Sequence, residues 1–322
     1  MKSPIFIFSL PRSGSTLLQR VLMSHKQIAS VAEPWILLPF FYARKENGIL
    51  TEYTHNTARN AIEDFIKNLP NRENDYNQAL KQFILNLYEK QCVNGEMYFL
   101  DKTPRYHLII PEIAELFPDA KFIFLFRNPI QILSSIIQTW GDGKLRYIYP
   151  YFVDFDFGIK NLSTGYLLLK NKSLAINYET FVNNPENTLK SICDYLDIKL
   201  NINMLNDFTL RNINGKAGDP SGIKNYNKIE ASTLDKWKKT FSNTTRIRIA
   251  KNIIKKIDDD ILKIQGYSQE SIIATLEEVS YSKWPNIYDF FYWEINNLIV
   301  RFKLNLLLGK KFRRQYKKRL IS

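Results

Sequence analysis

The first twenty-five residues constrain the fold more than any other stretch of the chain. An apolar, β-prone run at residues 4–8 leads into a short polar loop, and apolar residues then recur at helical spacing over residues 17–23. This order predicts a buried strand, a tight loop and a helix. Within the loop, Pro11 cannot continue a strand, and Gly14 permits a positive φ or a close backbone approach.

The loop suits an anion. Ser13 and Thr16 lie where the helix is predicted to begin, and there free backbone N–H groups and the helix dipole favour negative charge. Arg12 adds a planar, permanently charged group that matches phosphate or sulfate oxygens. A P-loop kinase or ATPase would have Gly at position 9 and Lys at position 15, whereas this chain has Ser9 and Ser15. The alternative is a chance Ser/Gly cluster at an ordinary strand–turn–helix corner.

Strands and helices alternate along the chain. Four more strands are predicted, at residues 27–32, 96–100, 121–126 and 173–178. Helices are predicted at residues 56–68, 76–91, 107–116, 130–140, 158–171, 185–196, 231–240, 244–256 and 268–280. This alternation predicts an α/β fold of three layers, with a central parallel sheet flanked by helices.

Ligands of such sheets bind at the carboxyl ends of the strands. Five residues with useful chemistry lie at or just past a predicted strand end: Arg12, Glu33, Lys102, Arg127 and Tyr178. The sequence therefore predicts one site at one edge of the sheet.

The run Pro-Arg-Ser-Gly-Ser-Thr-Leu-Leu after the first strand resembles the 5′-phosphosulfate loop of sulfotransferases, most closely that of the tyrosylprotein-sulfotransferase and bacterial branches. Those enzymes use 3′-phosphoadenosine 5′-phosphosulfate (PAPS). The resemblance covers residues 1–240 and implies a P-loop-like fold. It also implies that the donor's phosphosulfate contacts Arg12, Ser13, Gly14, Ser15 and Thr16.

Other parts of the family pattern follow. Arg127 and Ser135 resemble the pair that binds the 3′-phosphate. Three further residues resemble nucleotide contacts, the last two after an alignment gap: Tyr178, Ser221 and Lys228. The family often has another basic residue where this chain has Thr139, so the 3′-phosphate contact is either weaker here or made by Lys228.

The catalytic pattern of the resemblance rests on two residues. Glu33 lies 21 residues after Arg12, the separation at which tyrosylprotein-sulfotransferase-like enzymes carry their catalytic glutamate. A hydroxyl nucleophile needs such a base, although Glu33 also fits a salt-bridge partner or a helix N-terminal acid. Lys102 matches the family lysine that neutralises charge on the leaving oxygens, a role that Arg12 shares. We expect Asp101 to pair with Lys102 or Arg12.

Composition bounds the remaining possibilities. With two cysteines and three histidines, we expect neither a disulfide framework nor a metal site, and the expected reaction needs no metal. No signal peptide and no membrane span are predicted, so a cytoplasmic protein is expected. We predict a sulfotransferase domain at residues 1–267 and a helical, basic tail at residues 268–322.

The tail holds most of the charge. Of the formal net charge of +13, nine cations and no acid lie between residues 295 and 322, which leaves only +4 for the other 294 residues. Residues 287–319 therefore predict an amphipathic helix lying on an anionic membrane at its inner face. The alternative is a helix packed on the domain with a frayed basic end. Nucleic acid is not expected as a partner, because a basic tail alone is weak support for it.

The function predicted from these residues is transfer of a sulfuryl group from PAPS to an acceptor hydroxyl. We expect a glycan or lipid-linked glycan as acceptor, with the aromatic segments 35–53 and 140–157 as a platform for sugar rings or for a tyrosine. The alternatives are sulfation of protein tyrosine, a P-loop small-molecule kinase, and a non-catalytic membrane-bound module.

Overall fold

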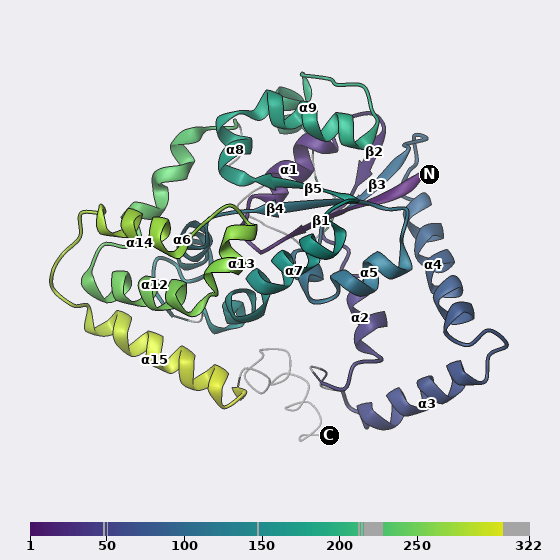
Figure 1. Cartoon of the computed structure of the whole chain (residues 1–322), viewed down its shortest axis with the longest axis horizontal. Coiled ribbons are helices and arrows are strands. Elements are labelled where there is room, and N and C mark those ends of the chain that lie inside the picture. Colours follow the sequence, from purple (N-terminus) through teal and green to yellow (C-terminus); the bar gives the residue numbers. More distant parts are fainter. Residues whose placement is uncertain are drawn as a thin grey trace, which may run out of the picture. The chain divides into compact units, whose positions relative to one another are not determined.

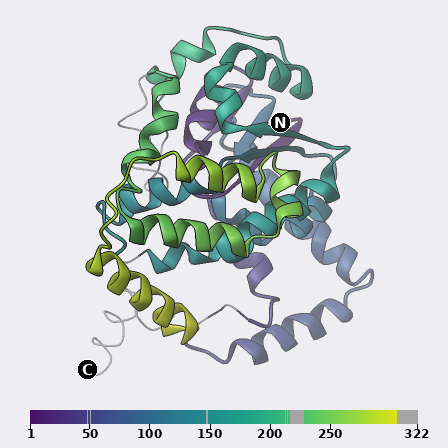
Figure 2. The same ribbon diagram turned by 60° about the vertical axis from the view of Figure 1, so that its left-hand side comes forward.

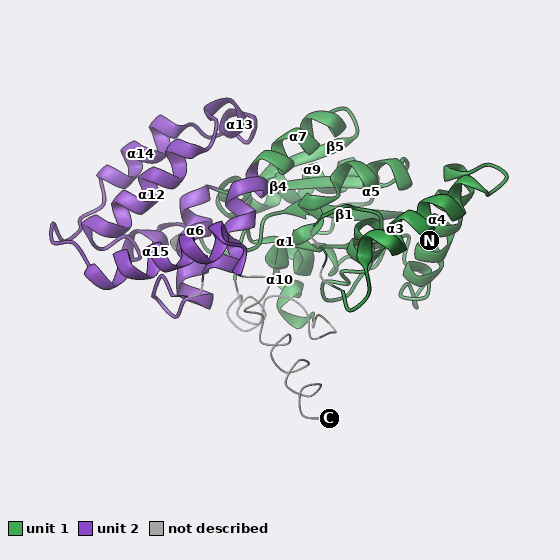
Figure 3. Cartoon of the chain, turned by 90° about the horizontal axis from the view of Figure 1, so that it is seen from below, with its two compact units in different colours: residues 1–127, 160–233 green, residues 128–159, 234–322 purple. Residues whose placement is uncertain are grey.

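The computed structural model describes residues 1–304, apart from residues 48, 50, 147, 212, 214 and 216–227. The chain forms two compact units (Figure 3). The first consists of residues 1–127 and 160–233, and the second of residues 128–159 and the chain from residue 234 on. The predicted division after residue 267 stays a prediction.

A parallel five-stranded sheet is the centre of the first unit. Its strands are β1 (Ser3–Ser9), β2 (Ile28–Ser30), β3 (Tyr98–Asp101), β4 (Lys121–Phe126) and β5 (Ser173–Asn177), in the order β2-β3-β1-β4-β5. All five lie where the sequence predicts them. The central strands read as continuous apolar runs because both faces are covered. Phe6 and Phe8 of β1 pair in register with Phe122 and Phe124 of β4, and all four are fully buried.

Helices cover both faces of this sheet. In Figure 1, α1 (Ser15–Leu22), α8 (Tyr178–Asn183) and α9 (Pro185–Leu196) lie on one side, and α5 (Ile110–Leu116) and α7 (Ile159–Leu169) on the other. The predicted three-layer α/β class is therefore confirmed.

Two local predictions were wrong. The single helix predicted at residues 107–116 is a 3₁₀ turn, η1 (Pro104–Leu108), followed by α5, with a break at Ile109, whose φ is −142°. Tyr178 opens α8 instead of ending β5. A short helix, α2 (Leu37–Tyr42), lies in the aromatic segment 35–53, for which no helix was predicted.

The long connection from β2 to β3 also contains α3 (His55–Lys67) and α4 (Glu73–Glu89). Arg44 joins these two helices through ion pairs to Glu63 at 2.7 Å and to Glu73 at 2.6 Å. The first unit ends with α10 (Met204–Asp207) and η4 (Phe208–Leu210).

The second unit is helical. Its elements are α6 (Pro129–Trp140), η2 (Tyr149–Tyr151), the π-helical turn η3 (Asp154–Gly158), α12 (Thr244–Lys256), α13 (Asp259–Ile264), α14 (Gln269–Glu277) and α15 (Ile287–Arg301). The segment predicted as a helix at residues 231–240 is a 3₁₀ helix, η5 (Ala231–Lys239). Within this unit α12 packs against α14 and α15, and α15 also contacts η2 (Figure 2). None of the described helices is long and apolar enough to cross a bilayer.

Candidate functional site

The carboxyl ends of all five strands lie at one edge of the sheet, because the strands are parallel. The five predicted residues follow these ends: Arg12 after β1, Glu33 after β2, Lys102 after β3, Arg127 after β4 and Tyr178 after β5. Strand order reverses at β1, with β3 on one side and β4 on the other. Such a switch point is where open α/β sheets bind ligands.

The loop after β1 has an unusual backbone. Arg12 and Gly14 have positive φ angles of 69° and 87°. The positive φ predicted as possible at Gly14 is thus confirmed, and that at Arg12 was not expected, because a non-glycine residue rarely adopts it. The helix α1 begins directly after Gly14, which carries no side chain to cap the first N–H groups of the helix.

Two residues from distant strands hold this loop. A Cβ atom at Gly14 would collide with the ring of Tyr178, so only glycine fits there. The guanidinium of Arg127 lies over the Tyr178 ring, with Cζ 4.2 Å from the ring centroid. Its Nη1 donates a hydrogen bond of 2.8 Å to the carbonyl of Arg12. The ends of β1, β4 and β5 are thereby joined.

The hydroxyls of the loop are turned inward. Ser13, Ser15 and Thr16 are buried, and Ser13 Oγ has no hydrogen-bond partner among the described residues. A buried hydroxyl without a partner costs free energy. Together with the uncapped start of α1, this hydroxyl makes the loop a fit for the oxygens of an anionic group.

An ion pair joins the ends of β2 and β3. Lys102 Nζ lies 2.7 Å from Glu33 Oε1 and 3.4 Å from Thr16 Oγ1. The Lys102 side chain is 2% exposed and that of Glu33 11%. The structure therefore brings Glu33, Lys102 and the loop of β1 together. The pair also matches the alternative interpretation of Glu33 as a salt-bridge partner, so its role as a base stays a prediction.

The second oxygen of Glu33 is held as well. Trp35 Nε1 donates to Glu33 Oε2 at 3.1 Å, and the Trp35 backbone N–H donates to Thr103 Oγ1 at 3.4 Å. Trp35 has a φ of 58°, a strained value for an aromatic residue. The carboxylate is fixed between a cation and an indole N–H.

The ion pair expected between Lys102 and Asp101 is formed by Lys102 with Glu33 instead, and Asp101 is held by hydroxyl groups. This fully buried carboxylate accepts hydrogen bonds from the hydroxyls of Tyr88 at 2.5 Å, Tyr106 at 3.0 Å and Thr103 at 3.0 Å. Burial raises the pKa of Asp101 to about 6, although these hydroxyl donors lower it. Tyr106 also accepts from the backbone N–H of Leu37 at 3.3 Å, so Asp101 positions both the Lys102 strand end and the chain after Glu33.

A pocket of about 570 Å³ has Trp35, the hydrogen-bond donor to Glu33, in its wall. Its wall includes the aromatic rings of Trp35, Tyr42 and Tyr53 together with Arg105 and His55. The first of the two predicted aromatic segments therefore does line a cavity. Trp35 links the wall of this pocket to the Glu33 carboxylate through its indole N–H.

The other predicted residues are placed differently. Ser135 lies on α6 in the second unit, and its pairing with Arg127 stays a prediction. Lys228 is exposed, and Ser221 falls outside the described residues. Cys193 is buried and Cys92 half-buried. In the described ranges, no group of three or more His, Cys, Asp or Glu side chains is arranged to hold a metal ion.

Sequence reasoning missed the residues that hold Asp101, the neighbour of Lys102 in the Lys102–Glu33 pair. Thr103, Tyr88 and Tyr106 carry no motif, and their convergence on Asp101 is visible only in the fold. One signal was available: a carboxylate that ends a buried strand needs donors nearby.

Comparison with known proteins agrees with this architecture. A model of the sulfotransferase family matches residues 4–201. The chain is 24% identical over 278 residues to a putative protein-tyrosine sulfotransferase of Caenorhabditis briggsae, covering 83% of this chain and 90% of that protein. It is also 30% identical over 141 residues to the nodulation protein NoeE of Sinorhizobium fredii, covering 42% of this chain but only 31% of NoeE.

Among solved structures, the sulfotransferase domain from the Synechococcus PCC 7002 olefin synthase matches with a TM-score of 0.50 and 21% identity, covering 88% of this chain and 98% of that domain. This likeness supports the P-loop-like fold. The family match covers more than half of the sequence and includes all five strands. The chain therefore belongs to the sulfotransferase family.

Proposed function

We propose that this chain transfers a sulfuryl group from PAPS to the hydroxyl of an acceptor. The observation that carries the proposal is the Lys102–Glu33 pair, 2.7 Å between Nζ and Oε1, at the same strand edge as an anion-fitting loop. A base and a cation side by side suit a reaction that removes a proton at one oxygen and builds charge at another.

The residues present fit the donor. The inward hydroxyl of Ser13, the N–H groups at the start of α1 and the Arg12 side chain would hold its 5′ end, with Gly14, Ser15 and Thr16 in the same loop. Arg127 and Tyr178 border that loop and would contact the nucleotide. Ser135, Ser221 and Lys228 stay further proposed contacts. When bound, PAPS supplies a sulfuryl group already attached to a good phosphate leaving group.

In the proposed reaction, Glu33 accepts the proton of the acceptor hydroxyl through a carboxylate oxygen. The acceptor oxygen forms a bond to sulfur, and the bond from sulfur to the phosphate oxygen breaks, leaving its electron pair on 3′-phosphoadenosine 5′-phosphate (PAP). Lys102 and Arg12 stabilise the negative charge that grows on this oxygen. The buried Asp101 cluster keeps Lys102 in place and takes no proton from substrate.

For the acceptor we propose a carbohydrate, either a glycan or a lipid-linked glycan. The pocket beside Trp35 supports this, since flat aromatic rings pack against the apolar faces of sugars while polar groups at the rim reach hydroxyls. Protein tyrosine is the second candidate. It is favoured by the likeness to the C. briggsae protein, which covers 90% of that relative.

The test is a sulfate-transfer assay with labelled PAPS across glycans, lipid-linked glycans and tyrosine peptides. Label in a sugar is expected, and label only in tyrosine peptides would establish the second candidate instead. Calorimetric titration with PAP and with ATP plus magnesium separates the sulfotransferase from a kinase. Binding of ATP without any binding of PAP would refute the proposal.

A further inference from the structure

The helix α15 is docked on the rest of the second unit by buried polar residues, whereas most of its large apolar residues are exposed. Asp289 and Asn296, one on the first turn and one two turns later, are 3% and 2% exposed. An ordinary surface helix has the opposite arrangement, with an apolar stripe inward and polar residues outward. The inverted burial leaves an apolar surface on α15 whose role does not depend on the proposed reaction.

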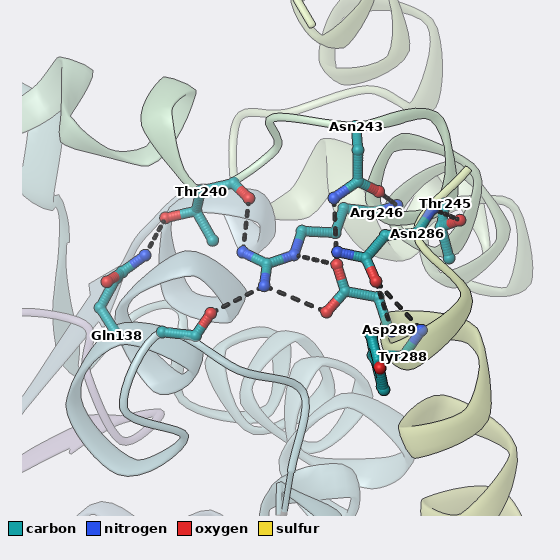
Figure 4. A network of polar contacts seen from close by, with 9 residues as sticks. Gln138, Thr240, Asn243, Thr245, Arg246, Asn286, Tyr288 and Asp289 are labelled. Atoms are coloured by element: carbon teal, nitrogen blue, oxygen red, sulfur yellow. Dashed lines mark hydrogen bonds and ion pairs between the residues drawn. The ribbon is translucent and has the colours of Figure 1, made fainter. Parts of the chain in front are cut away.

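Asp289 is the centre of the docking network (Figure 4). Arg246 of α12 contacts both of its oxygens, through Nε at 2.7 Å and Nη2 at 3.1 Å, and Asn243 donates to it at 3.0 Å. The same guanidinium donates to the carbonyls of Thr240 at 2.9 Å and Gly143 at 2.7 Å. A buried, bidentate pair with all these bonds made fixes the rotation of α15.

Asn296 fixes the next part of the same side. Its Nδ2 donates to the carbonyl of Leu145 at 2.7 Å, and its Oδ1 accepts from the N–H of Tyr149 at 3.0 Å. Trp293, between the two polar anchors, packs against Phe152 at 5.1 Å between ring centroids. The inward side of α15 is thus occupied by contacts with the rest of the second unit.

The outward side is rich in large apolar residues. Of the twenty exposed large hydrophobic side chains in the described part of the chain, nine lie between residues 284 and 304. Trp284, Ile287, Phe291 and Phe302 are each more than 60% exposed. We call the exposed side chains of residues 284–304 the outer face of α15. So much apolar surface in one place marks an interaction site.

Charge indicates what covers this face. The sequence directly after it contains seven cations and no acid between residues 305 and 322: Lys310, Lys311, Arg313, Arg314, Lys317, Lys318 and Arg319. Two copies of the chain meeting through this face would bring these like charges together, which opposes association. Aromatic and aliphatic side chains next to a run of Lys and Arg match the acyl boundary and headgroups of an anionic bilayer.

We propose that the outer face of α15 binds the surface of an anionic lipid bilayer, to which the cations of the following sequence are attracted. The helix lies on the membrane while its polar side keeps the second unit attached. Deleting the chain from residue 281 on is a poor test, since it would also remove Asp289 and leave Arg246 unpaired. Substitutions confined to the outer face avoid this problem.

The experiment is flotation of the full chain with vesicles of phosphatidylcholine containing about 30% phosphatidylglycerol, compared with pure phosphatidylcholine. Binding is expected only to the anionic vesicles and should weaken between about 0.05 and 0.5 M salt. The double variant Phe291→Ser with Leu298→Ser should bind at least about tenfold more weakly, because two apolar anchors are lost. Replacing Lys310, Lys311, Arg313 and Arg314 by Gln should have a similar effect.

Phe65→Ser is the matched control, since Phe65 is 66% exposed on α3 in the first unit and should leave vesicle binding unchanged. Circular dichroism must show that all variants are folded. Failure of the full chain to bind anionic vesicles at low salt overturns the proposal. Equal vesicle binding by the double variant and by Phe65→Ser overturns it too. A dimer in solution that the double variant breaks, while its vesicle binding persists, also overturns the proposal.

Discussion

The guanidinium of Arg127 stacks on the ring of Tyr178, with Cζ 4.2 Å from the ring centroid, and at the same time binds the carbonyl of Arg12. One side chain thus connects the ends of β1, β4 and β5. It fixes the loop that we propose for the donor's phosphosulfate, so its loss should affect nucleotide binding both directly and through the loop.

We predict that Arg127→Ala and Arg12→Ala each weaken PAP binding by about 1.5–3 kcal/mol, the scale of a charge-assisted contact. Tyr178→Phe should bind PAP nearly as well as wild type, since the stacking ring remains, whereas Tyr178→Ala should not. Calorimetric titration measures these affinities. Unchanged curves in both folded arginine variants would contradict the proposed site.

Gly14 tests the close approach of the loop to Tyr178. Gly14→Ala should lower the free energy of unfolding by about 1–3 kcal/mol, because the new Cβ meets the Tyr178 ring and φ is positive. Gly95→Ala is the control, since Gly95 has a φ of 79° but no described atom within 4 Å of the new Cβ. Urea unfolding should show a larger loss at Gly14, and equal losses would mean that the ring contact does not matter.

The sheet and its site edge were predictable because they depend on local patterns. Apolar runs such as residues 121–126 mark strands buried on both faces, and Arg127 directly follows one of them. The helix α2 could not be predicted in this way. It contains Pro39 and begins where Leu37 binds the hydroxyl of Tyr106, a residue 69 positions away.

The inverted burial of α15 was equally hidden. Its aromatic and aliphatic residues predict an amphipathic helix but not which side faces the protein. Asp289 is buried because Asn243 and Arg246 supply its partners, and Asn296 because Leu145 and Tyr149 do. Contacts over such separations leave no local pattern in the sequence.

Asp101 should give stability a pH dependence of unusual sign. Its pKa is raised from 3.8 to about 6 by burial, so between these values the folded state holds a proton that the unfolded state has lost. The free energy of unfolding therefore falls as pH rises from about 4 to about 6, by up to about 3 kcal/mol for this group. Carboxylates whose pKa is lowered, such as Glu63, act in the opposite direction.

The variant Asp101→Asn isolates the contribution of Asp101 to the pH dependence of stability, because Asn cannot titrate. The contributions of the other carboxylates are the same in both proteins and cancel in the comparison. The stability of wild type relative to this variant should decrease between about pH 4 and about pH 6.5. Urea unfolding across this range measures both proteins. Parallel stability curves would show that Asp101 titrates normally.

The Asp289–Arg246 pair should be essential to the second unit. Asp289→Ala is expected to cost about 3–5 kcal/mol, because it leaves a buried guanidinium unpaired. The exposed pair of Lys251 with Glu277, 2.6 Å apart, is the control, and Glu277→Ala should cost less than about 1 kcal/mol. A shift in the urea midpoint measures both, and equal small shifts would argue against the docking of α15 by this network.

Glu33→Gln is the variant that bears most directly on mechanism. Gln keeps the shape of the side chain and its contacts with Trp35 but cannot accept the proton. Turnover should fall by roughly 10²–10⁴, the usual contribution of a general base, while PAP binding stays near normal. Glu46→Gln, which alters the ion pair of the exposed Glu46 with Arg59, is the control.

If Glu33→Gln retained turnover within a few-fold, the base would lie elsewhere. Two other titratable residues, His25 and Asp101, are poor replacements in the fold. Both ring nitrogens of His25 are engaged, one with the carbonyl of Lys199 at 3.1 Å and the other with the N–H of Gln27 at 3.2 Å. Asp101 is fully buried and accepts from three hydroxyls, so no acceptor oxygen can reach it. Such a result would therefore point to His55, which lines the pocket with Trp35, as the next base to test.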